Sequence, residues 1–170
     1  MTKKSVGKKI ILLIGSLAVC ILAGYLTLNY FMPGMPEWYD GLVKPVYSQP
    51  AWLFSPLWMA SFVLMGIILA LILLAESDIR HRDILFGLNL FGFQILFVLV
   101  WAFAFFALHQ LFISFICIIA VWATLLSTVI HSFRFSVRIG LLFIPYFLWV
   151  CYLVYLNYGL MTLNNAVHIL

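Results

Sequence analysis

Five long runs of apolar residues divide this chain, and they constrain its fold more than any other feature. They cover residues 10–32, 52–75, 84–108, 110–131 and 137–160. Each is close to the ~20 residues that an α-helix needs to cross the hydrocarbon core of a bilayer. None contains an acidic residue, and Arg138, at the edge of the last run, is the only lysine or arginine in any of them. The sequence therefore predicts an all-α membrane protein, a five-transmembrane-helix bundle in which residues 1–170 form a single domain.

Other architectures fit these runs less well. Charged residues make up 8% of the chain, whereas a soluble domain usually carries about 25%. No run alternates polar and apolar residues with period two, so a β-barrel is not expected. Residues 84–108 and 110–131 meet with almost no loop, and together they are too long for one crossing, so we expect a tight helical hairpin there. The first run continues to Met32 without a cleavage site, which favours a retained first helix over a signal peptide.

The basic residues predict the orientation of the bundle. With five helices, eight of the nine lysines and arginines share one side of the membrane, and Lys44 alone lies on the other. The positive-inside rule then puts the N-terminus in the cytoplasm and the C-terminus outside, in an integral protein of the cell membrane. Positive charge beside anionic membrane lipid also accounts for the basic composition, so no nucleic-acid partner is expected.

Signatures of enzyme chemistry are missing from the sequence. Cys20, Cys117 and Cys151 all fall inside apolar runs, and no CxxC motif occurs. The four histidines are far apart, so no pair has the spacing of a metal site. There is no nucleophile–base motif, P-loop or GxGxxG, so we expect no metal and no required cofactor.

Residues 33–51 form the one long loop, and their composition predicts a stiff lid over the ends of the helices. Four prolines occur in this segment: Pro33, Pro36, Pro45 and Pro50. Proline fixes φ and lacks a backbone donor, so we expect no helix in this loop. A long ordered loop in a compact protein usually serves function.

Aromatic and polarizable side chains recur at helical spacing on three of the predicted helices. Each stripe contains one tryptophan that lies at mid-depth in the membrane, and the uncharged polar residues Gln94 and Asn157 should face protein or a cavity. The stripes are Trp58, Phe62, Met65 and Leu69; Gln94, Val98, Trp101 and Phe105; and Tyr146, Trp149, Leu153 and Asn157. Two interpretations stay open: helix packing, or a pocket for a large, flat, apolar ligand.

The first helix carries a face of small residues. Ser16, Cys20 and Gly24 recur at every fourth position, which permits close approach of another helix. That helix belongs either to a second copy of the chain or to the same bundle.

Four segments together resemble one family of membrane proteins. They are WYDGLVKP (38–45), QPAWLFSPLW (49–58), WAFAFF (101–106) and PYFLWVCYLVYLN (145–157). Their order and spacing are similar to those of the tryptophan-rich sensory protein family (TspO/MBR), also called translocator protein or peripheral benzodiazepine receptor.

The resemblance implies a five-helix bundle, often a homodimer, that binds tetrapyrroles such as protoporphyrin IX or heme and, in many members, sterols. Roles proposed for the family include tetrapyrrole transport, stress sensing and light-dependent porphyrin breakdown. We therefore expect a membrane receptor or binding protein whose ligand is a porphyrin or heme. The alternative, from another class, is a catalyst of light- or oxidant-dependent porphyrin degradation.

The resemblance also carries site residues onto this sequence. Trp58 and Trp149 match the tryptophans implicated in porphyrin handling, and they are the candidates for any catalytic role. Phe62, Trp101 and the loop residue Tyr39 match other positions around the pocket. Together with the helical stripes, this gives the predicted ligand-binding set: Tyr39, Trp58, Phe62, Val98, Trp101, Tyr146, Trp149 and Leu153.

Three residues depart from the family pattern. Gln49 replaces the first proline of the usual Pro-Pro, and Val98 stands where many members carry a pocket asparagine. Leu153 occupies a position that is often small. Val98 would remove a polar ligand contact and Leu153 would add bulk to the wall, which argues against drug-type ligands.

The predicted orientation has a direct test. A topology reporter fused after Leu170 should be active only outside the cytoplasm, because an odd number of crossings puts the two termini on opposite sides. Activity of that reporter in the cytoplasm would show that the helix count is wrong, most simply at His109 and Gln110.

Overall fold

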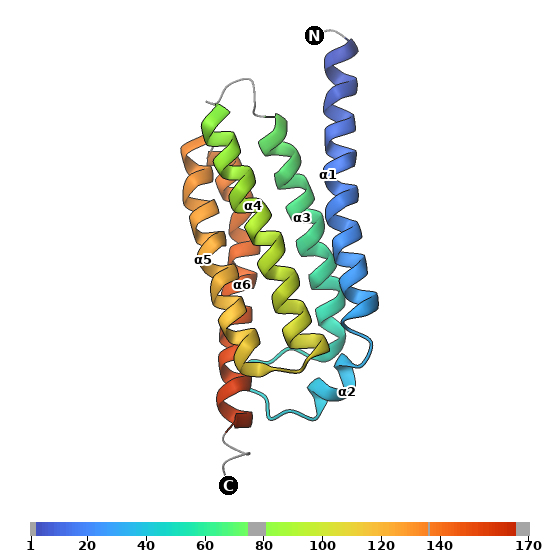
Figure 1. The fold of residues 1–170 in the computed structure, drawn as a ribbon, viewed down its shortest axis with the longest axis vertical. Coiled ribbons are helices and arrows are strands. Elements are labelled where there is room, and N and C mark those ends of the chain that lie inside the picture. Colours follow the sequence, from blue (N-terminus) through green and yellow to red (C-terminus); the bar gives the residue numbers. More distant parts are fainter. Residues whose placement is uncertain (1–2, 75–80, 136, 166–170) are drawn as a thin grey trace.

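The computed structural model is an all-helical bundle, and it describes residues 3–74, 81–135 and 137–165 (Figure 1). Five helices in this part of the chain are long and apolar enough to cross a membrane. They are α1 (Lys3–Tyr30), α3 (Phe54–Leu74), α4 (His81–Ala102, continued by η3), α5 (Leu111–Phe135) and α6 (Val137–Asn165). The predicted fold class, a five-helix membrane bundle, is confirmed.

Several helices extend beyond the apolar runs. Helix α1 begins at Lys3, ahead of the apolar run that starts at residue 10, and α6 continues to Asn165. Both extensions carry polar residues, because a helix can continue past the hydrocarbon core into the headgroup region. The apolar runs therefore locate the crossings, and the polar flanks set where the helices end.

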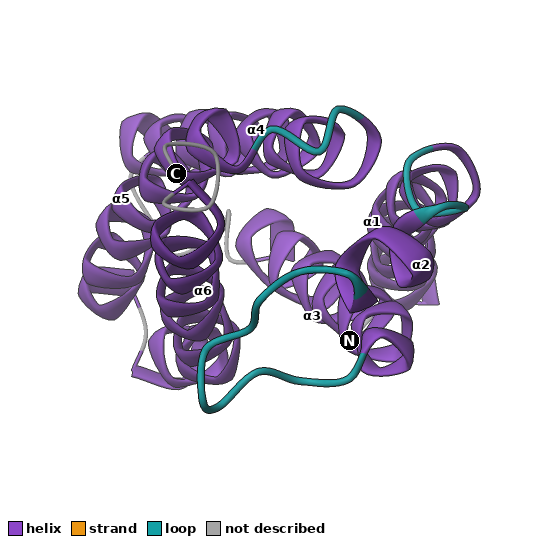
Figure 2. Cartoon of the chain, turned by 90° about the horizontal axis from the view of Figure 1, so that it is seen from below, coloured by secondary structure: helices purple, strands orange, loops and turns teal. Residues whose placement is uncertain are grey.

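One prediction about the loop is wrong. Residues 35–40 form a short helix, α2 (Met35–Asp40), and Ala51–Leu53 form one turn of 3₁₀-helix, η1. Pro36 lies in the first turn of α2, where a missing backbone donor costs nothing because the first N–H groups of a helix have no partner within it. The remaining segment, residues 41–50, has no regular structure and crosses the end of the bundle between α3 and α6 (Figure 2).

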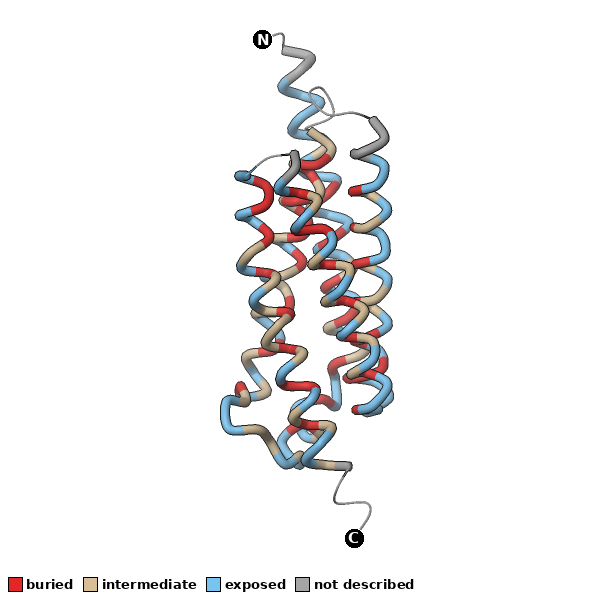
Figure 3. Tube along the Cα trace, turned by 90° about the vertical axis from the view of Figure 1, so that its left-hand side faces the viewer, coloured by how far each residue is buried: buried red, intermediate tan, exposed pale blue. Residues whose placement is uncertain are grey.

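The helices of the bundle pack in two groups. Helix α1 packs on α3, while α5 packs between α4 and α6. Buried positions lie toward the interior of the bundle and beneath the lid, and exposed positions line the outside (Figure 3). Many of the exposed side chains are Ile, Leu, Val or Phe, as expected for a surface that faces lipid.

Glycine allows α1 and α3 to approach closely. A Cβ on Gly24 would lie 2.9 Å from the Phe62 ring, and one on Gly66 would lie 3.0 Å from the Leu17 Cα. Ser16 and Cys20 are buried on the same side of α1. The small-residue face of α1 thus packs against α3 of the same chain. Of the two predicted partners, it is the helix of the same bundle that occupies this face.

The predicted tight hairpin between the third and fourth crossings is present. Helix α4 continues into a short π-helix, η3 (Phe103–Ala107), and α5 begins at Leu111. His109 turns the chain with a φ of 54°, a left-handed conformation that histidine adopts more readily than most residues. Its ring stacks on Trp38 of α2 with centroids 4.3 Å apart, which joins the hairpin to the lid.

The α1–α3 contact predicts opposite effects for two glycine substitutions. Gly66→Ala should lower thermal stability in detergent, because its methyl group meets the Leu17 backbone and overpacking costs about 1–3 kcal/mol. Gly92→Ala on α4 is the control: nothing lies within 4 Å of its new Cβ, so the higher helix propensity of alanine should leave stability unchanged or raise it. Equal melting temperatures for the two variants would contradict close packing at Gly66.

Candidate functional site: a closed aromatic cavity

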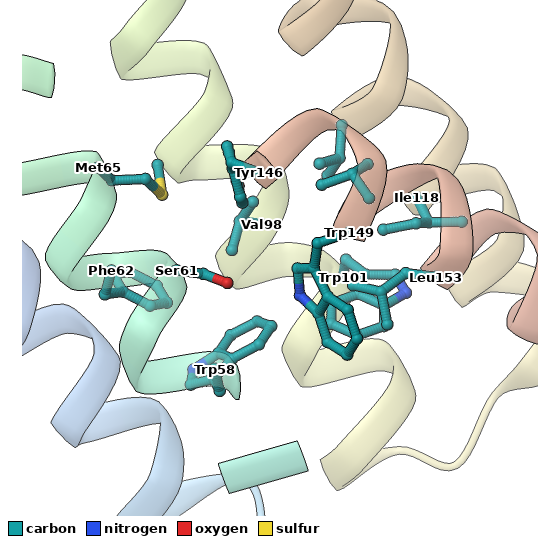
Figure 4. Close-up of a pocket in the computed structure, with 12 residues that line it drawn as sticks. Trp58, Ser61, Phe62, Met65, Val98, Trp101, Ile118, Tyr146, Trp149 and Leu153 are labelled. Atoms are coloured by element: carbon teal, nitrogen blue, oxygen red, sulfur yellow. The ribbon is translucent and has the colours of Figure 1, made fainter. Parts of the chain in front are cut away.

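An enclosed cavity lies between the helices beneath the lid (Figure 4). Its free volume is about 10 Å³, which is about the space that one water molecule needs. Four helices line it, with α3 and α6 on opposite sides. The lining residues are Trp58, Ser61, Phe62 and Met65 of α3; Val98 and Trp101 of α4; Ile118 and Val121 of α5; and Tyr146, Trp149, Val150 and Leu153 of α6.

Seven of the eight predicted ligand-binding residues meet at this cavity. Tyr39 does not line it: its ring is fully buried in the lid, 5.2 Å from that of Phe54. The predicted set lacked Ser61, Met65, Ile118, Val121 and Val150, although Met65 belonged to the aromatic stripe on the same helix. Ser61 follows Trp58 by three positions, so the stripe on α3 offered a signal for it, whereas Ile118 and Val121 look like any other apolar residues of a helix.

The cavity wall is built from aromatic rings that contact one another. Trp101 lies 5.5 Å from Trp58 and stacks on Phe105 at 5.3 Å. Phe106 meets the edges of Trp58 and Trp101 at 5.9 and 5.4 Å. Offset and edge-to-face pairs such as these contribute about 0.5–1.5 kcal/mol each beyond the burial of area. The η3 turn therefore supplies two rings that hold the two tryptophans in place.

Asn157 provides the polar contact of the Trp101 indole. The Trp101 Nε1–H donates to Asn157 Oδ1 over a long 3.5 Å, and the Ser114 hydroxyl donates to the same oxygen at 2.9 Å. Asn157 Nδ2 in turn donates to the Leu153 carbonyl at 3.2 Å. This one amide links α4, α5 and α6 behind the cavity.

Gln94 has the same role at the other end of the cavity. Its Nε2 donates to the Tyr146 hydroxyl at 3.2 Å, and its Oε1 accepts from the Thr124 hydroxyl at 2.7 Å. As expected for polar groups within apolar spans, Gln94 and Asn157 both face protein. They fix Tyr146 and Trp101 without placing a charge in the cavity.

The indole of Trp58 is different, because its N–H has no partner. Trp58 is 3% exposed, and its Nε1 is one of two buried side-chain nitrogens without a hydrogen bond in the described part of the chain; the other is Gln49 Nε2. A buried donor left unpaired costs about 1–3 kcal/mol. An acceptor on a bound molecule would satisfy the Trp58 indole.

Two residues of α6 hold the lid loop, residues 41–50, over the bundle. The Tyr152 hydroxyl accepts a hydrogen bond from the backbone N–H of Gln49 at 3.0 Å and donates one to the Tyr47 carbonyl at 3.1 Å. The Asn164 side chain accepts from the Val43 amide and donates to the Val43 carbonyl, both at 3.0 Å. The lid is therefore fixed through its backbone, independently of most of its side chains.

Tyr39 fixes the lid from the other side. Its hydroxyl donates to the Gln49 carbonyl at 3.0 Å, and the Lys44 ammonium lies 5.0 Å from the centre of its ring. Burial, the largest cause, raises the pKa of the Tyr39 phenol well above its usual value. The phenol consequently stays protonated, as a donor, throughout the physiological pH range.

Comparison with known proteins agrees with this architecture. The sequence profile of the TspO/MBR family matches residues 12–163. The chain is 31% identical to the tryptophan-rich protein TspO of Chlorobaculum tepidum, over 92% of this chain and 98% of that one. It is 32% identical to the protein CrtK of Rhodobacter capsulatus (85% and 88% covered) and 23% identical to the translocator protein of Sus scrofa (85% of each).

This chain belongs to the TspO/MBR family. It is an integral membrane protein, as the five apolar helices also indicate.

The three departures from the family pattern fall at the site or in the lid. Val98 and Leu153 are buried in the cavity wall. Gln49 is buried in the lid, and its side-chain nitrogen Nε2 has no hydrogen-bond partner. No group of three His, Cys, Asp or Glu side chains among the described residues is placed to hold a metal ion. The chemistry that this TspO/MBR site offers is therefore apolar contact, ring stacking and the buried, unpaired indole N–H of Trp58.

Removing the Asn157 amide should destabilise the bundle. Asn157→Leu leaves the Trp101 indole without its acceptor and removes one of the two acceptors of the Ser114 hydroxyl, the other being the Leu111 carbonyl at 2.9 Å. We expect a loss of about 1–3 kcal/mol in the free energy of unfolding. Asn29→Leu is the matched control: Asn29 is exposed and bonds only one turn back, to the Tyr25 carbonyl, so its loss should stay within about 0.5 kcal/mol. Thermal unfolding in one detergent measures both variants, and similar losses would contradict a structural role for the Asn157 network.

Proposed function

We propose that this protein is a membrane receptor or binding protein for porphyrins, such as protoporphyrin IX or heme, with a role in tetrapyrrole transport or stress sensing. The observation that supports this most is the pair Trp58 and Trp149, which come from α3 and α6 and line one apolar cavity (Figure 4). Two indoles on opposite walls suit a flat aromatic molecule held between them. Sterol-like molecules, which are also flat and apolar, are a second ligand class.

The chemistry of the walls supports a tetrapyrrole in particular. Ring stacking uses the whole face of a macrocycle, and the walls present Trp58, Phe62, Trp101 and Trp149. The free indole N–H of Trp58 is matched by a ligand that carries acceptor atoms at its edge, such as a carboxylate. An aliphatic lipid chain offers neither feature.

The names of relatives point in the same direction. The chain is 28% identical to a protein of Cereibacter sphaeroides named tryptophan-rich sensory protein, and the relative in Sus scrofa is named translocator protein. We extend a sensory or transport-related role to this chain because it shares their family.

Binding requires that the cavity opens. Pockets for ligands of this size usually hold about 300–1,000 Å³, against about 10 Å³ here. Hydrogen bonds tie Tyr146 of α6 to α4 and Trp101 of α4 to α6, whereas the side-chain hydrogen bond described for α3, from Ser61 to the Leu57 carbonyl, stays within that helix. We therefore expect the ligand to separate α3 from α6.

A second candidate function is light- or oxidant-dependent degradation of the bound porphyrin. Trp149 stacks on Tyr152 with ring centroids 5.4 Å apart and planes 23° from parallel. A light-excited porphyrin can sensitise dioxygen, which then oxidises the macrocycle, and an indole and a phenol in contact beside it can act as redox partners. Illumination of the complex would then bleach the porphyrin band and produce a new product band.

The ends of the bundle support the predicted orientation in the cell membrane. Lys8, Lys9 and Arg138 lie at one end, and Lys44 lies in the lid at the other (Figure 1). The first end would face the cytoplasm by the positive-inside rule, so the lid would lie near the outer surface. A homodimer stays a prediction from the family resemblance.

Porphyrin titration of three variants tests the proposed site. Trp149→Ala and Trp58→Ala should each weaken protoporphyrin binding at least about tenfold, since about 1.4 kcal/mol corresponds to one decade. Trp149→Phe keeps most of the ring area and should bind nearly as well as the parent protein. If the indole takes part in light-driven chemistry, Trp149→Phe should bind normally and stop the bleaching.

Trp122→Ala serves as the control, because Trp122 packs on Phe147 outside the cavity. It should leave the affinity unchanged. Unchanged affinity in both Trp58→Ala and Trp149→Ala, in folded protein, would show that the porphyrin site is elsewhere.

A further inference from the structure

A second hollow lies on the outer side of the seam between α3 and α6. It is a groove of about 190 Å³, lined by Leu57, Ala60, Ser61 and Leu64 of α3 and by Pro145, Tyr146 and Trp149 of α6. Ser61, Tyr146 and Trp149 also line the inner cavity. These three side chains are therefore the wall that separates the groove from the cavity.

The groove faces the hydrocarbon region. Both helices are candidate membrane spans, and Ala60 and Pro145 are exposed on their outer faces. Tyr152, which holds the lid, follows Pro145 by seven residues. This spacing corresponds to about 10 Å along a helix. The groove thus opens sideways, below the level of the lid.

The wall between the two hollows is thin and unevenly fixed. Ser61 is small, and Tyr146 is buried and bonded to Gln94 at 3.2 Å. Trp149 is only half-buried, and its ring stacks on Tyr152. Rotation of the Trp149 side chain is accordingly the smallest movement that joins the groove to the cavity.

The lid offers a more difficult route. Tyr152 and Asn164 hold its backbone through four hydrogen bonds, and Tyr39 adds a fifth from within the lid. Opening it would break several of these bonds together, whereas a side chain changes rotamer much faster than a loop rearranges.

Helix α6 is also weakened at the level of the groove. Pro145 lies inside the helix and has no N–H, so the helix lacks one backbone hydrogen bond there. Prolines are the commonest positions at which helices bend. Bending at Pro145 would widen the α3–α6 seam where the groove already exists.

We propose that the α3–α6 groove is a lateral entrance through which the flat apolar ligand passes from the bilayer into the cavity, with Trp149 as the side chain that opens and closes it. This inference rests on the proposed function. An apolar ligand partitions into the hydrocarbon region, so an entrance from the membrane meets it at a higher concentration than one from water.

The test fills the groove without touching the cavity. Ala60→Trp adds a large side chain to the groove, and Ala60 is not among the cavity residues. A blocked route slows entry and exit equally and leaves the equilibrium unchanged. We expect Ala60→Trp to lower both the association rate and the dissociation rate of protoporphyrin IX at least about tenfold. A tenfold change corresponds to an increase of about 1.4 kcal/mol in the barrier. The Kd should stay unchanged.

Ala123→Trp on α5 is the matched control, because Ala123 is exposed on a different helix. The rates are measured by porphyrin absorbance after mixing protein in phosphatidylcholine vesicles with vesicles that carry protoporphyrin IX. Leu64→Trp, also in the groove, is the second variant if Ala60→Trp does not fold. Ala123→Trp should match the parent protein in both rates.

Three results would overturn the proposal. Unchanged rates in the groove variants exclude the lateral route, and faster rates in Tyr152→Phe would then point to entry through the lid. A weaker Kd with an unchanged association rate would make the groove part of the binding site rather than an entrance. Failure of the parent protein to bind protoporphyrin at equilibrium would instead overturn the proposed function, and the entrance with it.

Discussion

The contacts of the Trp101 indole hold the cavity together. Its ring meets Trp58 of α3 and Phe105 of η3, and its N–H points to Asn157 of α6. Helices in a bilayer gain little from the hydrophobic effect when they associate, so ring packing and buried hydrogen bonds of this kind decide how they are placed. Because one side chain from α4 makes all these contacts, the shape of the cavity depends on it more than on any residue of the outer surface.

The pairing of polar side chains behind the cavity walls explains why the site is apolar. Two amides, Gln94 and Asn157, satisfy the polar groups behind the walls, whereas the buried indole N–H of Trp58 has no partner. The lid closes the end of the bundle through backbone bonds to Tyr152 and Asn164. The described lining residues include no Asp, Glu, His, Lys or Arg.

Much of the fold was predictable from the sequence, and the reason is periodicity. Apolar runs of membrane length fix the crossings, and the 3.6-residue repeat brings Trp58 and Phe62 to one face of a helix. What α5 contributes could not be predicted, since Ile118 and Val121 differ in no way from lipid-facing residues. Nor does the sequence show that the cavity is nearly closed, because free volume depends on fractions of an ångström between rings.

The lid shows a second limit. Its position over the bundle was expected, but its short helix α2 was not, because Pro36 was counted against a helix although it lies in the first turn. Tyr152 and Asn164 look like ordinary polar residues near the end of a span, and only the fold brings them to residues 43–49. Contacts between segments more than a hundred residues apart leave no local signal.

The central claim is that a tetrapyrrole occupies a cavity that opens between α3 and α6. The most direct measurement is the distance between spin labels on Val63 of α3 and Leu148 of α6, both exposed, in protein whose native cysteines are replaced, with and without protoporphyrin IX. We predict that this distance increases on binding, while the distance between labels on Val19 of α1 and Val63 stays the same. Saturating porphyrin with no change in the α3–α6 distance would contradict it.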